Sequence, residues 1–433
     1  MTTDALTQYA VPSQGLHLRR KAGSLALVLA GYDLMLAVMI IMAGSQGIHR
    51  FVPPLLVWLA IYALVALKYA THLRTLFNVM RENLAIFTFP LVALLSTVWS
   101  VSPGASAYSG VQLSVTYMAG LWLGWRYRPG DIAFVMVLAL SPLVALSLVN
   151  WLTGMFGEVY ASSGGLLGIF SNKNTLGRMA LLLGVVTFGL LIGRRNRPMV
   201  TLALLGIFTM SALALALSKS ATSTVVMIGT AALFLALSLH LFRVGTRLVV
   251  LLVGALGLMG IFAVMAFGNI DLVDEVLGAL GKSSNLTGRT SIWGLAGQQI
   301  AAQPWLGVGF DAYWDSNTFL VVDRIQRSFG NGLISFHNFV LDIWVVLGLA
   351  GIVAITLTLG SILLTYWRYY AISRDVWGAM MLAIFVAAIG VALFNPLLHA
   401  QHGNMIVILI AFTVSARIET RRLSQQRHAC ARA

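Results

Sequence analysis

The stretch SFHNFVLDIWVVLGLAGIVAITL, residues 335–357, passes from a polar opening into a long apolar run. A helix needs about 20 mostly apolar residues to cross the hydrocarbon core of a bilayer, and this run is long enough to do so. Its only charged side chain is Asp342, which follows His337 by five residues. The stretch therefore predicts a membrane-spanning helix with titratable groups near its N-terminus.

The rest of the chain has the same apolar character. Apolar residues make up 59% of the 433 positions and charged residues only 10%, against roughly 25% charged in ordinary soluble domains. We therefore expect an all-α, polytopic inner-membrane helical bundle with about 12 transmembrane helices and one large periplasmic loop. The expected spans are residues 22–43, 51–69, 83–99, 111–125, 131–150, 174–192, 199–217, 221–240, 248–268, 337–358, 376–394 and 402–416. The fourth and twelfth runs are short, which also allows ten or eleven spans.

Basic residues indicate the orientation, because Lys and Arg are retained in short cytoplasmic loops. With the N-terminus in the cytoplasm, the inside segments hold twenty of the 28 Lys and Arg residues. The net charge of +14 is then a signal of topology and of contact with anionic membrane lipids, and it does not indicate nucleic-acid binding. The predicted organisation is a cytoplasmic N-terminus (1–21), transmembrane helices 1–9 (22–268), a periplasmic loop (269–336), transmembrane helices 10–12 (337–416) and a basic cytoplasmic tail (417–433).

The long loop at 269–336 is rich in aromatic residues, which argues against disorder. Within it, Ile292, Leu295, Ala296 and Ile300 recur at helical spacing and predict a short helix that stops before Pro304. Arg289 falls in the first turn of this helix, where a cation is slightly unfavourable against the helix dipole. An anion bound at the helix start would remove that conflict, because the free amides and the guanidinium would both face it.

Several short motifs occur together in this topology. They are GRTSIW at 288–293, PWLGVG at 304–309, HN at 337–338, the Trp99–Pro103 segment and GIFSNKNTLG at 168–177. In this combination the chain resembles the superfamily of O-antigen ligases and polysaccharide polymerases over about residues 80–415. The lysine in the SNKN segment is closer to exopolysaccharide polymerases of the ExoQ type than to lipopolysaccharide ligases.

The resemblance implies a glycosyl transfer at the periplasmic face that needs no metal and no cofactor. The donor would be an oligosaccharide linked to undecaprenyl diphosphate, and the acceptor would be a sugar hydroxyl of a second glycan. Polymerases of this type work beside a flippase and a chain-length regulator, which are the partners the resemblance implies. An O-antigen ligase, which transfers the glycan to the lipid A core, is the alternative, and a transporter or flippase of lipid-linked oligosaccharide is the second alternative.

The family's cations match positions of this chain. Arg289 matches the loop arginine, so the resemblance assigns it to the diphosphate as a catalytic residue. Lys219, in the turn SKS, stands where the family has an arginine, and a lysine keeps the cation but loses the bidentate fork. Its alternative role is a snorkelling lysine at a helix end. The remaining candidate substrate ligands are Lys173, Asn174, Arg324 and Arg327.

His337 is the candidate catalytic base. An imidazole with a pKa near 6.5 is partly neutral at periplasmic pH and accepts a proton from an attacking hydroxyl. The alternative is that His337 binds the diphosphate or the acceptor without moving a proton. Asn338 either orients the substrate or caps the helix, and Asp342 is either functional or paired. Among other polar groups, we expect Asp33 to pair with a neighbouring helix.

Overall fold

A computed structural model of the protein describes residues 24–162, 164–193, 196–239, 289–315, 335–395 and 397–430. The chain order of its longer helices is α2 (Ser24–Gly44), α3 (Pro54–Thr71), α4 (Leu73–Glu82), α5 (Thr88–Leu95), α6 (Pro103–Arg126), α7 (Pro129–Thr153), α8 (Lys173–Gly193), α9 (Pro198–Ser218), α10 (Ala221–Ser238), α13 (Arg289–Ala302), α16 (Phe339–Ser373), α17 (Val376–Ala392) and α18 (Asn404–Cys430). Shorter elements are η2 (Gly47–Arg50), η3 (Leu84–Phe87), η4 (Ser96–Val98), α14 (Ala312–Asp315), β1 (Tyr160–Ala161) and β2 (Gly165–Leu166).

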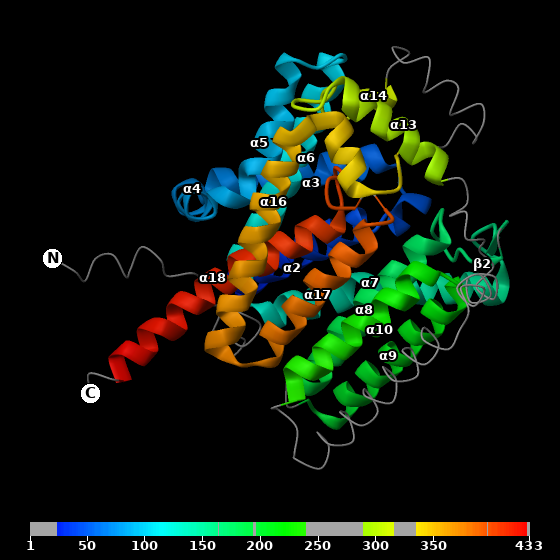
Figure 1. Ribbon diagram of the computed structural model, residues 1–433. Coiled ribbons are helices and arrows are strands. Elements are labelled where there is room, and N and C mark those ends of the chain that lie inside the picture. The colour runs from blue at the N-terminus through cyan, green and yellow to red at the C-terminus, as the bar shows by residue number, and fades with distance from the viewer. Residues whose placement is uncertain are drawn as a thin grey trace, which may run out of the picture.

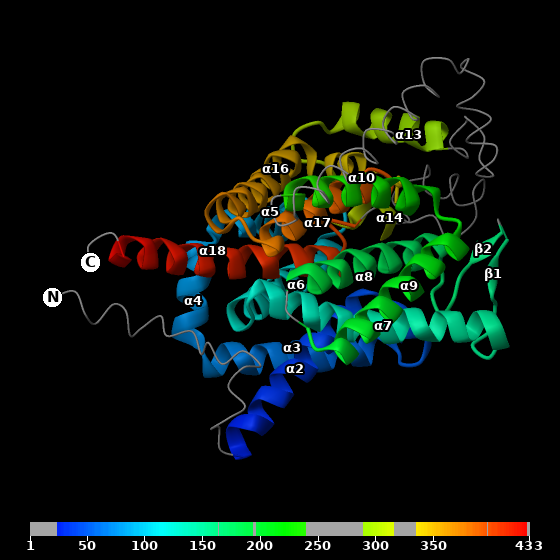
Figure 2. The ribbon, with the colours of Figure 1, turned by 90° about the horizontal axis from the view of Figure 1, so that it is seen from below.

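The helices form an up-and-down bundle with two distinct ends (Figure 1). The antiparallel hairpin of β1 and β2 joins the end of α7 to the start of α8 and marks what we call the hairpin end. The C-terminal half of α18 extends from the opposite end, which we call the tail end, and Figure 2 shows the same arrangement from below. Short connections between apolar helices force neighbours to run antiparallel, so successive helices start at alternate ends.

The first half of α18 is the centre of the bundle. Every residue from Asn404 to Ala416 is buried, and α18 packs against α6 and α16. A helix that is apolar on all sides belongs inside a large bundle or within lipid. Beyond Ala416 the helix continues because Arg417 finds partners: its guanidinium donates to the carbonyl of Glu82 at 2.7 Å and to Ser361 Oγ at 2.6 Å.

Helices occupy the positions of eleven expected spans, and the expected span 248–268 lies outside the described residues. Among the described residues, six helices are long and apolar enough to cross a membrane by length and composition, or up to seven if one bent pair counts as a span. The two runs that were expected to be short are in fact long helices, α6 and α18. The all-α membrane architecture is confirmed, and the count of twelve stays a prediction.

Three features differ from the expected spans. Residues 83–99 do not form one regular α-helix but the succession η3, α5 and η4. The segment Leu84–Val98 also meets α4 at a bend of 84°. The helix α16 is longer than residues 337–358 and is interrupted at Gly348 (φ 61°, ψ −157°). The hairpin of β1 and β2 carries no apolar periodicity that would have predicted it, since each strand is only two residues long.

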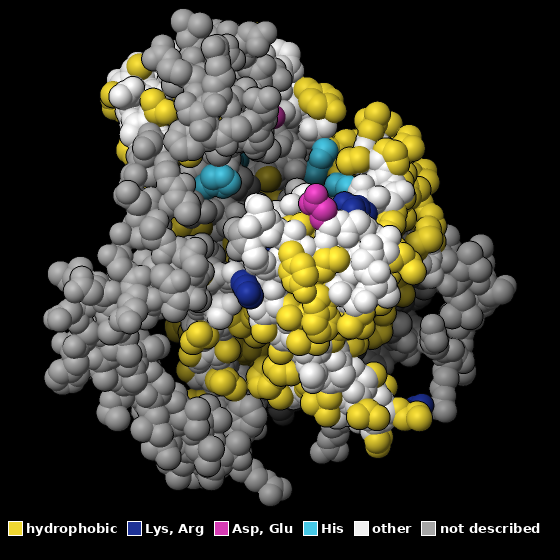
Figure 3. Space-filling view, turned by 90° about the vertical axis from the view of Figure 1, so that its right-hand side faces the viewer, with side chains coloured by type: hydrophobic (Ala, Val, Ile, Leu, Met, Phe, Trp, Pro, Cys, Tyr) yellow, Lys and Arg dark blue, Asp and Glu magenta, His cyan; other side chains and the backbone are white. Residues whose placement is uncertain are grey.

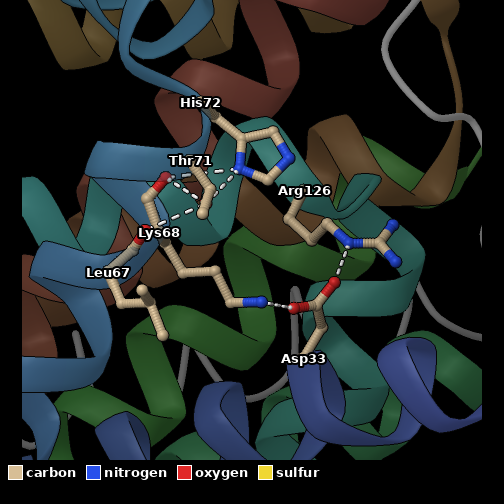
Figure 4. Close-up of polar contacts among 6 residues, drawn as sticks. All are labelled: Asp33, Leu67, Lys68, Thr71, His72 and Arg126. Atoms are coloured by element: carbon tan, nitrogen blue, oxygen red, sulfur yellow. Dashed lines mark hydrogen bonds and ion pairs between the residues drawn. The ribbon is translucent and has the colours of Figure 1, made fainter.

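Asp33 lies between two cations within the bundle, as expected for a paired intramembrane acid (Figure 4). Its Oδ1 lies 2.5 Å from Lys68 Nζ, and its Oδ2 lies 2.6 Å from Arg126 Nε. The three side chains join α2, α3 and α6 near the tail end. Removing one member of a buried ion pair typically costs about 3–5 kcal/mol because the remaining charge is left uncompensated, so the charges of the three helices depend on one another.

Candidate functional site

Backbone strain gathers at the hairpin end. Positive φ angles are uncommon for residues other than glycine, and such strain tends to collect at functional sites. Among the described residues, those that are not glycine and have positive φ are Gln46, Lys219, Asp311, His337, Arg374 and His402. All except Arg374 lie in connections at the hairpin end. Two of them, Lys219 and His337, are candidate site residues from the sequence.

The two lysine-bearing turns predicted to bind substrate meet in the fold. Ser220 Oγ donates a hydrogen bond of 2.9 Å to Asn174 Oδ1. Gly165 permits a second close approach, because a Cβ there would lie 2.4 Å from the carbonyl oxygen of Ser218 and 2.8 Å from Lys173 Cδ. The structure therefore brings Lys173, Asn174 and the turn around Lys219 to one place, although they come from different helices.

This meeting point suits an anion. Both α8 and α10 begin here, and the free N–H groups and dipole of a helix start favour negative charge. Ser220 caps α10 by accepting a hydrogen bond of 3.4 Å from the N–H of Ser223. Lys219 is exposed just before that helix start, and Lys173 is the first residue of α8. Two cations and two helix starts together supply the positive charge that a diphosphate requires.

His337 and Asn338 form a second part of the hairpin end. The side chain of Asn338 accepts hydrogen bonds from the N–H groups of Val340 and Leu341, at 3.0 and 3.3 Å, so Asn338 caps α16. The N–H of His337 donates to Ser335 Oγ at 3.2 Å, and its ring is half-buried. Of the two roles expected for Asn338, the capping role is the one the structure shows.

The segment 304–309 braces the break in α16. A break frees backbone N–H and C=O groups, and an unsatisfied group within a bilayer costs several kcal/mol. Four hydrogen bonds of 2.8–3.2 Å meet this need, from the N–H groups of Leu349, Ala350, Val308 and Gly309 to the carbonyls of Pro304, Trp305, Val345 and Val346 respectively. Gly307 and Gly348 permit this contact: a Cβ on Gly348 would lie 2.3 Å from the carbonyl carbon of Trp305. The PWLGVG motif thus fixes the half-helix that follows His337.

Histidine side chains lie at the edge of a hollow in the hairpin end, which faces the viewer in Figure 3. The ring of His402 lies 4.1 Å from the ring of Trp58 in a stacked arrangement, and its Nε2 is hydrogen-bonded to the hydroxyl of Tyr62. Burial lowers the pKa of His399 to about 4. Across the described ranges no three His, Cys, Asp or Glu side chains come together as metal ligands, and His402 serves to dock the loop 397–403 onto α3.

Part of the predicted site lies outside the described residues. Arg324 and Arg327 belong to this group, and so does the side chain of Arg289, although the backbone of Arg289 starts α13 as predicted. The predicted short helix is confirmed, since α13 ends at Ala302, before Pro304, and buries Ile292 and Ala296. Trp293 Nε1 donates to the carbonyl of Phe336 at 3.0 Å, which ties α13 to the residue before His337.

Sequence reasoning missed Arg178. This arginine lies within α8 and is only 6% exposed, and its Nε has no hydrogen-bond partner among the residues that the structure describes. The signal was present in the sequence, since Arg178 is the only charged residue within the apolar run 174–192. An ionisable residue inside a membrane span marks a functional site by default.

An open apolar groove lies elsewhere on the molecule, beside the break in α16. It is lined by Thr88, Leu91, Trp305, Leu349, Val353 and their neighbours on α5 and α16. A lining of this kind offers few hydrogen-bonding groups to a glycan, so the groove is not the polar site.

Two comparisons with known proteins agree. Residues 205–356 match the protein family described as O-Antigen ligase, and this range includes Lys219, His337 and the brace around Gly348. The chain is 28% identical over 280 residues to the exopolysaccharide production protein ExoQ of Rhizobium meliloti (strain 1021). The alignment covers 63% of this chain and 63% of the relative, so less than two thirds of the relative's length is spanned. The chain is therefore similar to the superfamily of O-antigen ligases and polysaccharide polymerases, as its sequence motifs predict.

Proposed function

We propose that the protein is a polysaccharide polymerase of exopolysaccharide biosynthesis, embedded in the bacterial inner membrane. It transfers a glycan from undecaprenyl diphosphate to a sugar hydroxyl at the periplasmic face, which in this proposal is the hairpin end. One observation carries the proposal: the turns that hold Lys173 and Lys219 meet at the starts of two helices, held by the bond from Ser220 to Asn174. The similarity to an exopolysaccharide production protein supports the polymer class.

In the proposed reaction, the acceptor hydroxyl oxygen attacks the anomeric carbon of the donor glycan. A new C–O bond forms there, and the bond between that carbon and the diphosphate oxygen breaks. The diphosphate leaves with the electron pair, and cations placed in advance stabilise the charge that develops on it. Lys173, Lys219 and Arg289 supply these cations, while His337 accepts the proton of the acceptor hydroxyl. Metal ions have no part in this proposal.

A second candidate is an O-antigen ligase, and the match to the O-Antigen ligase family favours it. The two reactions share the donor and the leaving group, and they differ in the acceptor. A polymerase adds the glycan to another lipid-linked glycan, whereas a ligase adds it to the lipid A core. A flippase that delivers the donor and a chain-length regulator are the expected partners of the polymerase. Transport of the lipid-linked oligosaccharide is less well supported, because the polar groups gather at one end and not at the midplane.

A reconstituted assay with lipid-linked donor tests the proposal. The double variant Lys173→Gln and Lys219→Gln should lose nearly all polymer formation, while Lys219→Arg should be tolerated because it keeps the cation. Arg289→Ala should abolish polymer, and Arg289→Lys should keep a fraction of it. Arg197→Gln is the matched control, because Arg197 is also exposed but flanks the other end of α9. Polymer formation at the wild-type level in the double variant, with normal protein abundance, would overturn the assignment.

The acceptor decides between the two candidates. Supplying lipid-linked repeat units alone should yield longer lipid-linked chains from a polymerase and no product from a ligase. Supplying lipid A core together with the donor should yield a core-linked glycan only from a ligase.

A further inference from the structure

Arg178 is a buried cation without a counter-charge among the described residues. Its side chain is 6% exposed, its Nε lacks a hydrogen-bond partner, and none of the described ion pairs includes it. A charge in a low-dielectric interior is strongly unfavourable unless it is paired and hydrogen-bonded. Arg417 of the same protein has the hydrogen-bond partners that a buried arginine normally has. Its guanidinium donates to Thr365, Glu82, Asn83 and Ser361.

The neighbours of Arg178 on α8 define where it points. Gly177 faces the turn before α10, because a Cβ there would lie 2.8 Å from Ser220 Cβ. Met179 faces α18, since its sulfur accepts a hydrogen bond of 3.2 Å from Asn404 Nδ2. Gly189 lies about three turns along the same stripe of α8 as Arg178, and it faces Met380 of α17. Arg178 therefore points into the interior between α10, α17 and α18.

This interior space is positive at the hairpin end. α8, α10 and α18 all begin there, and a helix start carries a partial positive charge. Lys173 begins α8 five residues before Arg178, about 7.5 Å along the helix axis. Lys219 is exposed and lies in the turn that contacts Gly177, the residue before the buried Arg178. The cations thus form two levels, one at the surface and one inside the bundle. Two levels of cations match an anion with two phosphates in line.

We infer that Arg178 is an anion ligand inside the bundle that holds the inner, lipid-side phosphate of a diphosphate ester, below Lys173 and Lys219. The inference rests on the proposed function, because it places the leaving group of that reaction. It explains why a membrane helix retains a cation at such a cost. The bound phosphate supplies the counter-charge that the described part of the chain does not, and the planar guanidinium suits two phosphate oxygens at once.

The inference predicts that replacing Arg178 has opposite effects on the stability of the protein and on its affinity for the ligand. Arg178→Met keeps the volume and removes the charge, so without ligand its melting temperature in detergent should rise above that of the wild type. Its affinity for undecaprenyl diphosphate should fall by about 10- to 100-fold, the range for one charge-assisted hydrogen-bonded contact. Arg178→Lys should have an intermediate affinity, because it keeps the cation without the fork.

Arg417→Met is the matched control. It removes an equally long arginine with four partners, so its melting temperature should fall while its affinity for undecaprenyl diphosphate stays unchanged. A lower melting temperature of Arg178→Met without ligand would show that Arg178 has a structural partner, and it would overturn the inference. Wild-type affinity in Arg178→Met or in Arg178→Lys would overturn it as well.

Titrations with three ligands distinguish a lipid-linked diphosphate from a free one. They also distinguish failure of the role of Arg178 from failure of the proposed function. Undecaprenyl diphosphate, undecaprenol and inorganic pyrophosphate are each titrated into wild type and Arg178→Met. If Arg178→Met loses affinity for undecaprenyl diphosphate but not for pyrophosphate, the result supports a lipid-side site. If it loses affinity for pyrophosphate alone, the inference is overturned. If wild type binds undecaprenyl diphosphate no better than undecaprenol, the proposed function itself fails. If wild type binds it tightly and Arg178→Met does too, only the role of Arg178 fails.

Discussion

The carboxylate of Asp342 holds the backbone beside His337: its Oδ1 accepts a hydrogen bond of 2.8 Å from the N–H of Phe336. Asp342 is 3% exposed, so this bond is shielded from water. The i to i+5 spacing on a helix does not bring the side chains of His337 and Asp342 into direct contact. The observed bond supports a positioning role for Asp342, because it reaches past His337 to the preceding residue.

Asp342→Asn should retain most activity, whereas Asp342→Leu should lose it. An asparagine oxygen still accepts the bond from Phe336, but leucine leaves a buried N–H without an acceptor, at a cost of about 1–3 kcal/mol. Polymer formation and the melting temperature of both variants in detergent measure the effect. An equal loss of polymer formation in both variants would show that the negative charge of Asp342 is required, and that its hydrogen bond to Phe336 does not explain its role.

His337→Ala and His337→Gln separate a base from a binding residue. General-base catalysis contributes about 10²- to 10⁴-fold in rate, whereas one neutral hydrogen bond contributes roughly tenfold or less. A base therefore predicts at least about a hundredfold loss of turnover in both variants, with little change in donor binding. The rate of the wild type should fall as the pH drops through the imidazole pKa, and that fall should be absent from both variants. Recovery of most of the rate by glutamine would identify a binding residue.

Gly348→Ala should destabilise the protein and abolish activity. A Cβ at this position would lie 2.3 Å from the carbonyl carbon of Trp305, and the positive φ adds strain. The expected loss in the free energy of unfolding is about 2–5 kcal/mol. Gly360→Ala is the control on the same helix, since no atom lies within 4 Å of its Cβ position. A stable, active Gly348→Ala variant would mean that the brace is not needed.

The stability of the protein should fall in mild acid because of His399. Burial lowers its pKa from 6.5 to about 4, so between these values the unfolded chain binds a proton that the folded chain does not. The free energy of unfolding therefore decreases as the pH falls from 6.5 to about 4, and this contribution is constant below that. Burial lowers the pKa of His49 too, which acts in the same direction. His399→Asn should make the fall of the melting temperature between pH 6.5 and about 4 smaller, whereas replacing the exposed His428 should leave that fall unchanged.

The orientation of the bundle is tested by fusions. A reporter that is active only in the periplasm should be active after Ser284 and silent after Asn196, because the basic connections face the cytoplasm. The reverse pattern would place the hairpin end in the cytoplasm and would remove the basis for periplasmic chemistry.

The helices were predictable because a long apolar run is expected only where lipid or a protein interior surrounds it. The cations Lys173 and Lys219 were also found as candidates, each from its own motif. Their meeting was not predictable, because it depends on how α8 packs against the turn before α10, through Gly165 and the bond from Ser220 to Asn174. Arg178 was overlooked because hydropathy averages over a window, in which one cation among many apolar residues disappears.

The length of α18 was underestimated for a related reason. Apolar character ends at Arg417, and the expected span ended one residue earlier. The helix continues because contacts far away in sequence, to Glu82 and Ser361, replace the lipid as its surroundings. A pattern of neighbouring residues carries no information on such partners.

The break at Gly348 imposes an order on the synthesis of this protein. The half-helix from Phe339 to Leu347 is too short to be stable alone, since isolated helices need about 12–15 residues, and too short to enter the membrane as an independent span. Its partners emerge from the ribosome first: residues 304–309 precede it, and they are in turn held through the bond from Val101 N–H to the carbonyl of Val308. His337 therefore reaches its final position only when three separately translated stretches have joined, so the protein completes its candidate site late in membrane insertion.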